Sequence, residues 1–316
     1  MTWIGEQGSG HFVKMLHNGI EYADMQLIAT SYYLMNHCLD LDEKTISDYF
    51  VSWNQGKLQS FLLEISAKIL RSNDSDGTPI IRKILDKAGQ KGTGSWSTIA
   101  ALKYGVPASM ITEAVLARVV SSFKNERIAL SNKYQKGIEV SEAPSKEQVE
   151  SMLVDLPQAM YAAKVIAYVQ GYQVIQAASD EHQWNLDFVA ITEIWRNGCI
   201  IRGKLLDALI EPIKIYQGNT YDDHKESGLL GGGVIQSLIS AEEEAALRRV
   251  VVYGIESGIP VPLFATAISY LDSIRTSTLS ANMIQAQRDF FGSHGFKRVD
   301  EDYDANSVLH HFDWNK

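Results

Sequence analysis

Five polar side chains recur at helical spacing near the start of the chain: Lys14, His17, Asn18, Glu21 and Tyr22. On a helix they fall within a sector of about 140°, so that one ligand could touch all of them. An amine can take up a proton as a base, and a carboxylic acid one or two turns away can return it. The imidazole, amide and phenol can hold hydroxyl groups. This face therefore suits a polyhydroxy acid that undergoes proton transfers.

The same pattern has a simpler explanation, which is a solvated helix face. Lys14, Asn18 and Glu21 are ordinary i,i+4 and i,i+3 neighbours, and helix geometry alone favours this alternative. Gly19 argues against it, because a glycine inside a helix costs about 1 kcal/mol relative to alanine. We expect another backbone to approach the helix closely at Gly19. The core side of the helix is predicted by its apolar positions: Val13, Leu16, Ile20, Ala23 and Leu27.

Two other segments carry cations that could bind an anion. The stretch "KGTG" places Lys91 beside glycines whose N–H groups can point at an anion. For this tetrapeptide by itself, the favoured alternative is a solvated loop after a helix that ends near Gly89. Arg118 lies in the apolar run "MITEAVLARVV". It either pairs with Glu113 or Glu126, or it binds a phosphate through its guanidinium fork.

Helical periodicity dominates the elements that must position these residues. Alternation typical of strands is scarce, and no βαβ pattern occurs, so we predict an all-α fold. Loops are expected at 73–79, 130–145 and 218–233. Apolar residues at three- and four-residue spacing predict helices at 11–36, 57–72, 108–132, 146–178, 188–210, 240–256 and 262–278.

Two segments are similar to each other, which indicates a degenerate internal duplication. "KMLHNGIEYADMQLIATSY", from Lys14, aligns with "KVIAYVQGYQVIQAASDEH", from Lys164. Similar turns follow, "WNQG" at Trp53 and "WRNG" at Trp195. We expect the two helical units to pack face to face around a shared core. The second copy replaces the histidine, asparagine and glutamate of the polar set by alanine, tyrosine and glycine, so a helix at this place does not need those groups to fold.

Composition narrows the classes of function. The chain has 316 residues, 45% hydrophobic and 21% charged, with a net charge of −9. That charge argues against nucleic acid or an anionic membrane as the main partner, and the apolar runs are too short for a membrane span. Cys38 and Cys199 lie far apart and indicate neither a disulfide framework nor a metal site. We therefore expect a cytoplasmic protein.

Four segments together resemble one known family: "GSGHFVKMLHNGIEYADMQLI", "ILDKAGQKGTGSWS", "ITEAVLARVVSSFKNERI" and "NMIQAQRDFFGSHGFKRVD". In the same order, they are similar to the substrate-binding half of 6-phosphogluconate dehydrogenase, the decarboxylating enzyme of the pentose phosphate pathway. The resemblance covers essentially the whole chain. It implies oxidation and decarboxylation of 6-phospho-D-gluconate to ribulose 5-phosphate, with NADP as hydride acceptor and without a metal.

The resemblance also implies roles for individual residues. Lys14 matches the general base, which takes the proton of the substrate's C3 hydroxyl, and Glu21 matches the general acid, which protonates the enediol. His17 and Asn18 match residues that hold the substrate near its reacting carbons. The binding site for the substrate phosphate is matched by Tyr22, Lys91, Thr93 and Arg118.

The end of the chain predicts a contact with a second subunit. We expect an all-helical domain over residues 1–290 and a tail over 291–316 that packs on the partner. Arg288 and His294 match residues that the partner subunit contributes in this family, so the resemblance implies a homodimer. Aromatic side chains of the tail have too few neighbours to be buried locally: Phe296, Tyr303, Phe312 and Trp314.

Two departures from the family pattern matter. The family has a second lysine where this chain has Ser95, a change that weakens or tunes phosphate binding. The sequence also shows no G-x-G-x-x-G after a strand and no parallel-sheet region, so we expect the N-terminal NADP-binding Rossmann domain of the family to be absent from it. The isolated chain is then expected to be inactive unless a separate NADP-binding Rossmann chain completes it.

Three hypotheses about function follow. The chain is the catalytic and dimerising half of a 6-phosphogluconate dehydrogenase, or a non-catalytic dimeric scaffold that binds sugar phosphates. In the third hypothesis it is the helical half of a related β-hydroxyacid dehydrogenase that acts on a smaller acid. Lys91, Arg118 and Arg288 argue against the third, because a small unphosphorylated acid does not need that set of cations.

Overall fold

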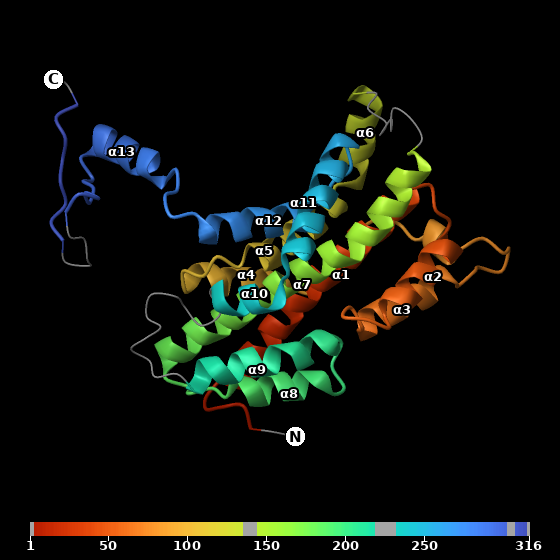
Figure 1. The fold of residues 1–316 in the computed structure, drawn as a ribbon, viewed down its shortest axis with the longest axis horizontal. Coiled ribbons are helices and arrows are strands. Elements are labelled where there is room, and N and C mark those ends of the chain that lie inside the picture. The colour runs from red at the N-terminus through yellow and green to blue at the C-terminus, as the bar shows by residue number, and fades with distance from the viewer. Residues whose placement is uncertain (1–2, 135–143, 219–231, 302–306, 315–316) are drawn as a thin grey trace. The chain divides into compact units, whose positions relative to one another are not determined.

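The computed structural model describes residues 3–134, 144–218, 232–301 and 307–314. These residues are mainly helical, and β-structure among them is limited to isolated bridges, which confirms the predicted all-α fold. None of the described helices combines the length and the hydropathy that a bilayer span requires. The helices in Figure 1 are α1 (Ser9–His37), α2 (Glu43–Trp53), α3 (Phe61–Leu70), the 3-10 turn η1 (Ile80–Lys83), α4 (Thr93–Lys103), α5 (Ser109–Ser122), α6 (Lys124–Tyr134), α7 (Lys146–His182), α8 (Phe188–Arg196), α9 (Lys204–Gly218), α10 (Gly232–Leu238), α11 (Ala241–Glu256), α12 (Pro262–Arg275) and α13 (Ala281–Gly292).

The chain divides into two compact units, Met1–Leu271 and Asp272–Lys316. The division falls within α12, which is earlier in the chain than the boundary expected after residue 290. The first unit carries the polar set of α1 and the main hydrophobic core, and the second unit carries α13 and the tail.

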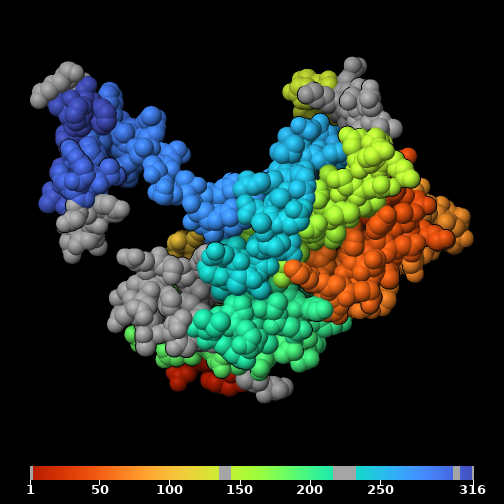
Figure 2. Space-filling model, in the orientation of Figure 1, coloured from red at the N-terminus to blue at the C-terminus, as the bar shows by residue number. Residues whose placement is uncertain are grey.

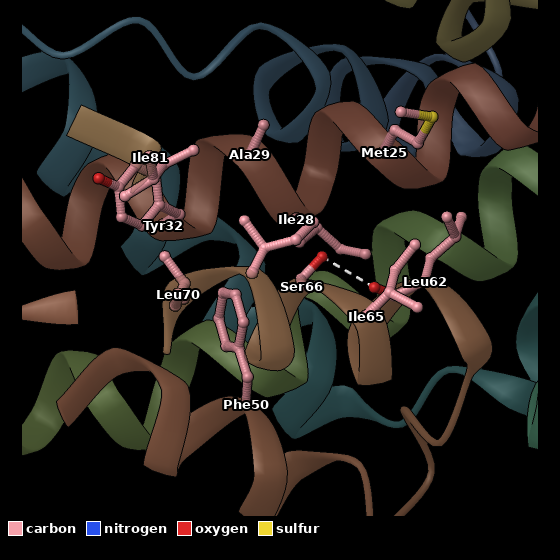
Figure 3. Close-up of a pocket in the computed structure, with 11 residues that line it drawn as sticks. Met25, Ile28, Ala29, Tyr32, Phe50, Leu62, Ile65, Ser66, Leu70 and Ile81 are labelled. Atoms are coloured by element: carbon pink, nitrogen blue, oxygen red, sulfur yellow. Dashed lines mark hydrogen bonds between the residues drawn. The ribbon is translucent and has the colours of Figure 1, made fainter. Parts of the chain in front are cut away.

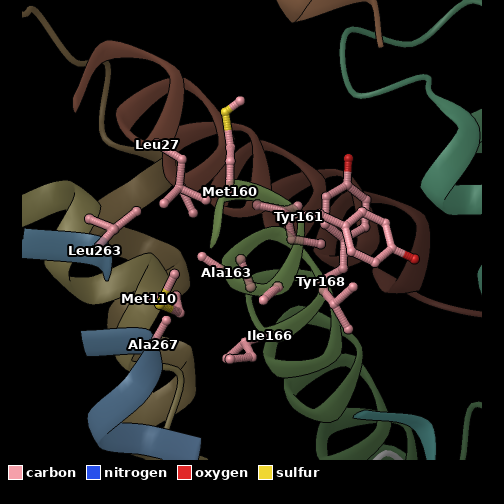
Figure 4. Packing of buried hydrophobic residues seen from close by; sticks show 14 of the residues in the cluster. Leu27, Met110, Met160, Tyr161, Ala163, Ile166, Tyr168, Leu263 and Ala267 are labelled. Carbon is pink, nitrogen blue, oxygen red and sulfur yellow. The ribbon is translucent and has the colours of Figure 1, made fainter. Parts of the chain in front are cut away.

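Two long helices, α1 and α7, pack against each other at the centre of the first unit. Every residue from Tyr161 to Tyr172 is buried, because α7 is apolar on all sides over this stretch and is covered on all sides. In the space-filling view, α11 lies over one face of α7 (Figure 2). Figure 4 shows the shared core, where Leu27 of α1 lies near Met110 of α5 and Met160 of α7.

The arrangement of the short helices supports the predicted duplication. In each half of the alignment a long helix, α1 or α7, is followed by a pair of short helices, α2 and α3 or α8 and α9. The turns within the two pairs meet in an antiparallel bridge between Ser60 and Gly203. Phe61 N donates to the carbonyl of Arg202 at 3.1 Å, and Lys204 N donates to that of Gln59 at 2.8 Å. The two copies are therefore joined both at their long helices and at equivalent turns.

Two of the expected helices are each a pair of helices in the structure. Residues 108–132 form α5 and α6, with a break at Phe123 after two serines whose hydroxyls donate to helix carbonyls. Residues 188–210 form α8 and α9, separated by a turn at Gly198 with φ +78°. The prediction also missed α2, α4, α10 and α13, which are short or weakly periodic.

The predicted loop at 73–79 is confirmed, with a small turn closed by an isolated bridge. The other two predicted loops, 130–145 and 218–233, lie mostly outside the described residues. Tyr303 of the tail also lies outside them. The described ends of those two loops are partly helical, in α6 and α10.

The second unit is organised around the buried carboxylate of Asp289 on α13. It accepts hydrogen bonds from the backbone N–H groups of Gly295 (2.9 Å) and Phe312 (3.1 Å). It also accepts from His311 Nδ1 and Trp314 Nε1, both at 2.9 Å. Burial by itself raises the pKa of Asp289, but these four bonds outweigh burial and hold its pKa well below the ordinary range. The side chain of Asp289 thus links four residues of the tail to α13.

Candidate functional site

The polar set of α1 is not a uniformly solvated face. His17 is fully buried, Tyr22 is buried, and Asn18 and Glu21 are half-buried, while Lys14 is exposed. Gly19 explains how the face becomes covered. A Cβ at this position would lie 2.8 Å from Ser97 Oγ and 3.1 Å from Ile111 Cγ2, so α4 and α5 pack closely against α1. The contact expected at Gly19 is present, although it is made by side chains rather than by a backbone.

A chain of short contacts links the polar groups of α1. Lys14 Nζ lies 3.2 Å from His17 Nδ1, which lies 3.1 Å from Asn18 Oδ1 and 4.0 Å from Glu21 Oε2. The Nδ1 atom can accept from the ammonium or donate to the amide oxygen, depending on the tautomer. The candidate base and the candidate acid therefore both lie within 4.0 Å of one imidazole nitrogen.

Burial sets the protonation of the two central groups. Desolvation and the nearby charge of Lys14 lower the pKa of His17 to about 4, so the imidazole is neutral near pH 7. Its Nε2 atom is buried and has no hydrogen-bond partner among the described residues. Burial raises the pKa of Glu21, and the opposing charges of Lys14 and Arg118 do not cancel the effect. A carboxyl group with a raised pKa can hold a proton and later donate it.

Arg118 reaches the same site from α5. Its guanidinium lies over the ring of Tyr22, 3.5 Å from the ring centre, and donates to the carbonyl of Gly89 at 3.1 Å and to Met25 Sδ at 3.4 Å. The two predicted carboxylate partners, Glu113 and Glu126, are not among the ion pairs of the described residues, and neither is Arg118. A cation held by a ring and a carbonyl remains free to bind an anion.

The "KGTG" segment lies beside Arg118, at the start of a helix. Gly92 adopts φ +96° as the residue before α4, and Thr93 is the first residue of that helix. A Cβ at Gly94 would lie 2.6 Å from the ring of Tyr22, so the first turn of α4 packs directly on the residue that Arg118 covers. Because no side chain caps α4, its first N–H groups and the exposed Lys91 are available to an anion. The expectation that this segment follows a helix ending near residue 89 is wrong, since it precedes α4.

Two predicted site residues belong to the second unit. Arg288 Nη1 donates to Gln285 Oε1 at 3.0 Å, and His294 packs edge-on against Phe291. The structure describes the two units separately, so the participation of Arg288 and His294 in the site stays a prediction.

Three further residues lie next to the polar set of α1 and were not predicted from the sequence as part of the site. Asp24 and Lys164 form a buried ion pair between α1 and α7, with Nζ and Oδ1 3.1 Å apart. Trp195 of α8 packs edge-on against His17, with ring centres 5.6 Å apart. A signal for the first pair was present, because Asp24 occupies a core-facing position of α1 and Lys164 lies in an apolar helix.

An apolar pocket of about 310 Å³ lies farther along α1, between α2, α3 and η1 (Figure 3). Met25 belongs both to its rim and to the contact with Arg118. Its remaining lining is mainly hydrophobic, including Ile28, Phe50 and Leu62. Such a lining does not suit a phosphorylated sugar acid, so this pocket is distinct from the polar site.

The fold and the polar site together define an all-α domain with a candidate acid–base pair next to a cationic helix terminus that is a candidate anion site. The family model described as "6-phosphogluconate dehydrogenase, C-terminal domain" matches residues 10–314. The chain therefore belongs to the 6-phosphogluconate dehydrogenase family and corresponds to its C-terminal domain.

Individual relatives agree with this assignment. The 6-phosphogluconate dehydrogenase of Ovis aries is 44% identical over 299 residues, which cover 93% of this chain and 59% of that protein. The NADP(+)-dependent decarboxylating enzyme of Bacillus subtilis is 41% identical, over 100% of this chain and 64% of its own length. A solved structure of the Plasmodium falciparum enzyme, studied in its apo form and with NADP+ or 6-phosphogluconate, matches with a TM-score of 0.88 at 35% identity, and covers 99% of this chain and 64% of that one. The chain thus spans about three fifths of the length of the curated relatives that it matches.

Proposed function

We propose that this chain is the substrate-binding and proton-transferring part of a decarboxylating 6-phosphogluconate dehydrogenase. The observation that carries the proposal is the contact chain from Lys14 through His17 to Glu21, beside Arg118. It combines a base, an acid and an anion site in one place, as oxidative decarboxylation of 6-phospho-D-gluconate to ribulose 5-phosphate requires.

Each group has one task in the proposed reaction. Lys14 takes the proton of the C3 hydroxyl as the carbon is oxidised. After carbon dioxide leaves the resulting β-keto acid, Glu21 gives its proton to the enediol. Neutral His17 and Asn18 hold the hydroxyl groups near the reacting carbons. The phosphate is bound by Arg118, Lys91, Thr93, the start of α4 and the phenol of Tyr22.

The described residues do not fit a dinucleotide. They contain no sheet and hence no strand–loop–helix unit of the kind that binds a pyrophosphate, and the polar set of α1 is used by the sugar acid. In this proposal the hydride acceptor is NADP, bound by a domain or a separate chain outside the described residues.

We further propose that the protein works as a cytoplasmic homodimer, in which Arg288 and His294 of one copy complete the site of the other. Exposed apolar side chains on α4 and α5 support a subunit contact, because such groups rarely gather on a free surface. They include Trp96, Ile99, Leu102, Leu116 and Val120. The free thiols of Cys38 and Cys199 are compatible with a reducing compartment.

A second candidate function is a dimeric scaffold that binds sugar phosphates without turnover. The specific observation in its favour is that the described residues offer a site for the sugar acid but none for the dinucleotide. The third hypothesis, a smaller substrate, is disfavoured by the cluster of Arg118, Lys91 and the start of α4, which matches a phosphate.

Ligand binding tests the site without any cofactor. We expect calorimetry to show weak binding of 6-phosphogluconate to the chain, and binding of gluconate to be weaker still. Arg118→Gln should weaken binding of 6-phosphogluconate by about tenfold or more, because it removes a charged phosphate contact. Arg127→Gln is the matched control, since Arg127 pairs with Asp86 and should leave affinity unchanged. No binding at millimolar ligand would contradict the site.

Turnover separates the two candidate functions. The chain alone should reduce no NADP with 6-phosphogluconate, and adding a separate family NADP-binding domain should restore reduction. Lys14→Ala should abolish the restored activity, while Lys103→Ala, an exposed lysine of α4, should keep it. Binding without restored turnover would favour the scaffold, and turnover that survives Lys14→Ala would remove Lys14 from its role.

A further inference from the structure

The interface between α1 and α7 contains a pair of buried opposite charges. Asp24 is 1% exposed and Lys164 is 4% exposed, with Oδ1 and Nζ 3.1 Å apart. Their neighbours along the two helices, Ala23 of α1 and Val165 of α7, are fully buried as well. The pair is thus shielded from water.

Stability alone does not account for this pair. Taking two charges out of water costs several kcal/mol per ion in real proteins, and well-packed hydrophobic residues are often neutral or better replacements. The geometry is also not optimised for stability. Although Asp24 Oδ1 lies 3.1 Å from Lys164 Nζ, neither carboxylate oxygen of Asp24 accepts a hydrogen bond of good geometry from the described residues. These two features favour a role for the pair other than packing.

The place of Asp24 indicates that role. It follows Glu21 by three residues on α1, so the two carboxyl groups are neighbours on the helix surface. Burial is the largest cause of the raised pKa of Glu21, while Lys14 of the same helix and Arg118 of α5 are cations that favour its ionised form. Asp24 is the anion that opposes them. The imidazole of His17 lies 4.0 Å from the Glu21 carboxylate. On α7, burial raises the pKa of the Tyr168 phenol, and the negative charges of Asp24 and Glu21 raise it further.

We propose that Asp24 and Lys164 are positioning residues, a buried ion pair that keeps a proton available on Glu21. The proposal rests on the function of Glu21 as the acid given above. The negative charge of Asp24 disfavours a second negative charge on the neighbouring Glu21, and Lys164 is the buried countercharge of Asp24 across the contact of α1 with α7. The second copy of the duplication thereby supports the chemistry of the first, although it contributes no group to the ligand.

Carbon-13 NMR of the side-chain carboxyl carbons in glutamate-labelled chain measures the titration of Glu21 directly, with Glu21→Gln to assign its signal. Asp24→Asn should lower the titration midpoint of Glu21 by about one pH unit, because the opposing charge is lost. Asp155→Asn is the matched control. Asp155 is also a buried aspartate in an ion pair, with Arg249, but belongs to the contact of α7 with α11. It should leave the midpoint of Glu21 unchanged.

The double variant Asp24→Asn/Lys164→Met covers the case in which the single substitution prevents folding. It leaves no lone buried charge. The midpoint of Glu21 should still fall, because the lost carboxylate of Asp24 is nearer to Glu21 than the lost ammonium of Lys164. The fall should be smaller than in the single variant, since the two lost charges have opposite effects. An unchanged or raised midpoint in the folded variants would overturn the inference. Since no cofactor or turnover enters this measurement, its outcome is independent of the proposed enzymatic activity.

Discussion

At the scale of single residues, His17 differs most from the solvated side chain that helix geometry alone favours. Its ring is enclosed by Trp195 on one side, and its Nδ1 atom contacts both Lys14 and Asn18. Desolvation and the lysine charge both act against an imidazolium ion at this place. The histidine is therefore suited to hold a substrate hydroxyl rather than to carry charge.

The protonation of His17 predicts a pH dependence of stability. The folded chain keeps this residue neutral down to a pKa of about 4, whereas the unfolded chain protonates it at its ordinary pKa of 6.5. The free energy of unfolding should therefore fall as the pH drops through this window, by about 2 kcal/mol from this group between pH 7 and pH 5. His17→Gln removes the titration, so its stability should fall less over the same interval. Urea unfolding of both proteins at the two pH values gives the difference, and equal losses would contradict a buried neutral imidazole.

At the scale of elements, the crossing of α1 with α4 determines the site. Gly19 lets Ser97 approach α1, where Ser97 Oγ donates to the carbonyls of Met15 (3.0 Å) and Thr93 (2.9 Å). The same approach places Gly94 against the ring of Tyr22. The uncapped start of α4 is thus held next to the polar face of α1 by two glycines and one serine.

A methyl group at Gly19 should disturb this crossing. Gly19→Ala gains helix propensity of about 1 kcal/mol, but its Cβ would meet Ser97 Cβ at 2.9 Å, and such overpacking costs about 1–3 kcal/mol. We expect a net loss of stability and weaker binding of 6-phosphogluconate. Gly10→Ala on the same helix is the control, because its nearest neighbour would be 3.9 Å away, and it should be neutral or stabilising. Denaturant unfolding checks both, and a Gly19→Ala protein as stable as Gly10→Ala would refute the close crossing.

At the scale of the whole molecule, the chain consists of a duplicated helical unit and a second unit with its own organising residue. Residues 161–172 of α7 are buried on all sides, while α1, in the equivalent place, keeps one polar face. In the second unit, the carboxylate of Asp289 accepts hydrogen bonds from four residues of the tail. The tail is therefore ordered by hydrogen bonds to one carboxylate.

Loss of that carboxylate should free the tail but leave the first unit folded. Asp289→Ala removes all four bonds, so trypsin should cut faster after Lys297 and Arg298, while the fragment that contains α1 and α7 stays resistant. Asp300→Asn is the control, because Asp300 is an exposed aspartate of the same tail whose hydrogen bonds, among the described residues, go to Arg298 and not to α13. Limited proteolysis followed by mass spectrometry measures the rates. Equal rates for the two variants would show that Asp289 does not order the tail.

Much of the fold was readable from the sequence. The long amphipathic or wholly apolar runs that became α1, α7, α11 and α12 were predicted, because their burial depends on a repeating pattern of side chains. The breaks within 108–132 and 188–210 were not, since they depend on single residues at which the backbone leaves the helix. The short α2, α4 and α13 were also missed, because so few turns give too weak a period.

By itself the sequence determined the all-α class, the duplication and the polar set of α1, since residue type and spacing are local properties of the chain. It left open how far Lys14, His17 and Glu21 are buried, and whether Arg118 pairs with a carboxylate. Only the tertiary structure decided these points, because burial, charge proximity and free hydrogen-bonding atoms arise when α4, α5 and α8 pack against α1. The pair of Asp24 and Lys164, from positions far apart in the chain, exists only through that packing.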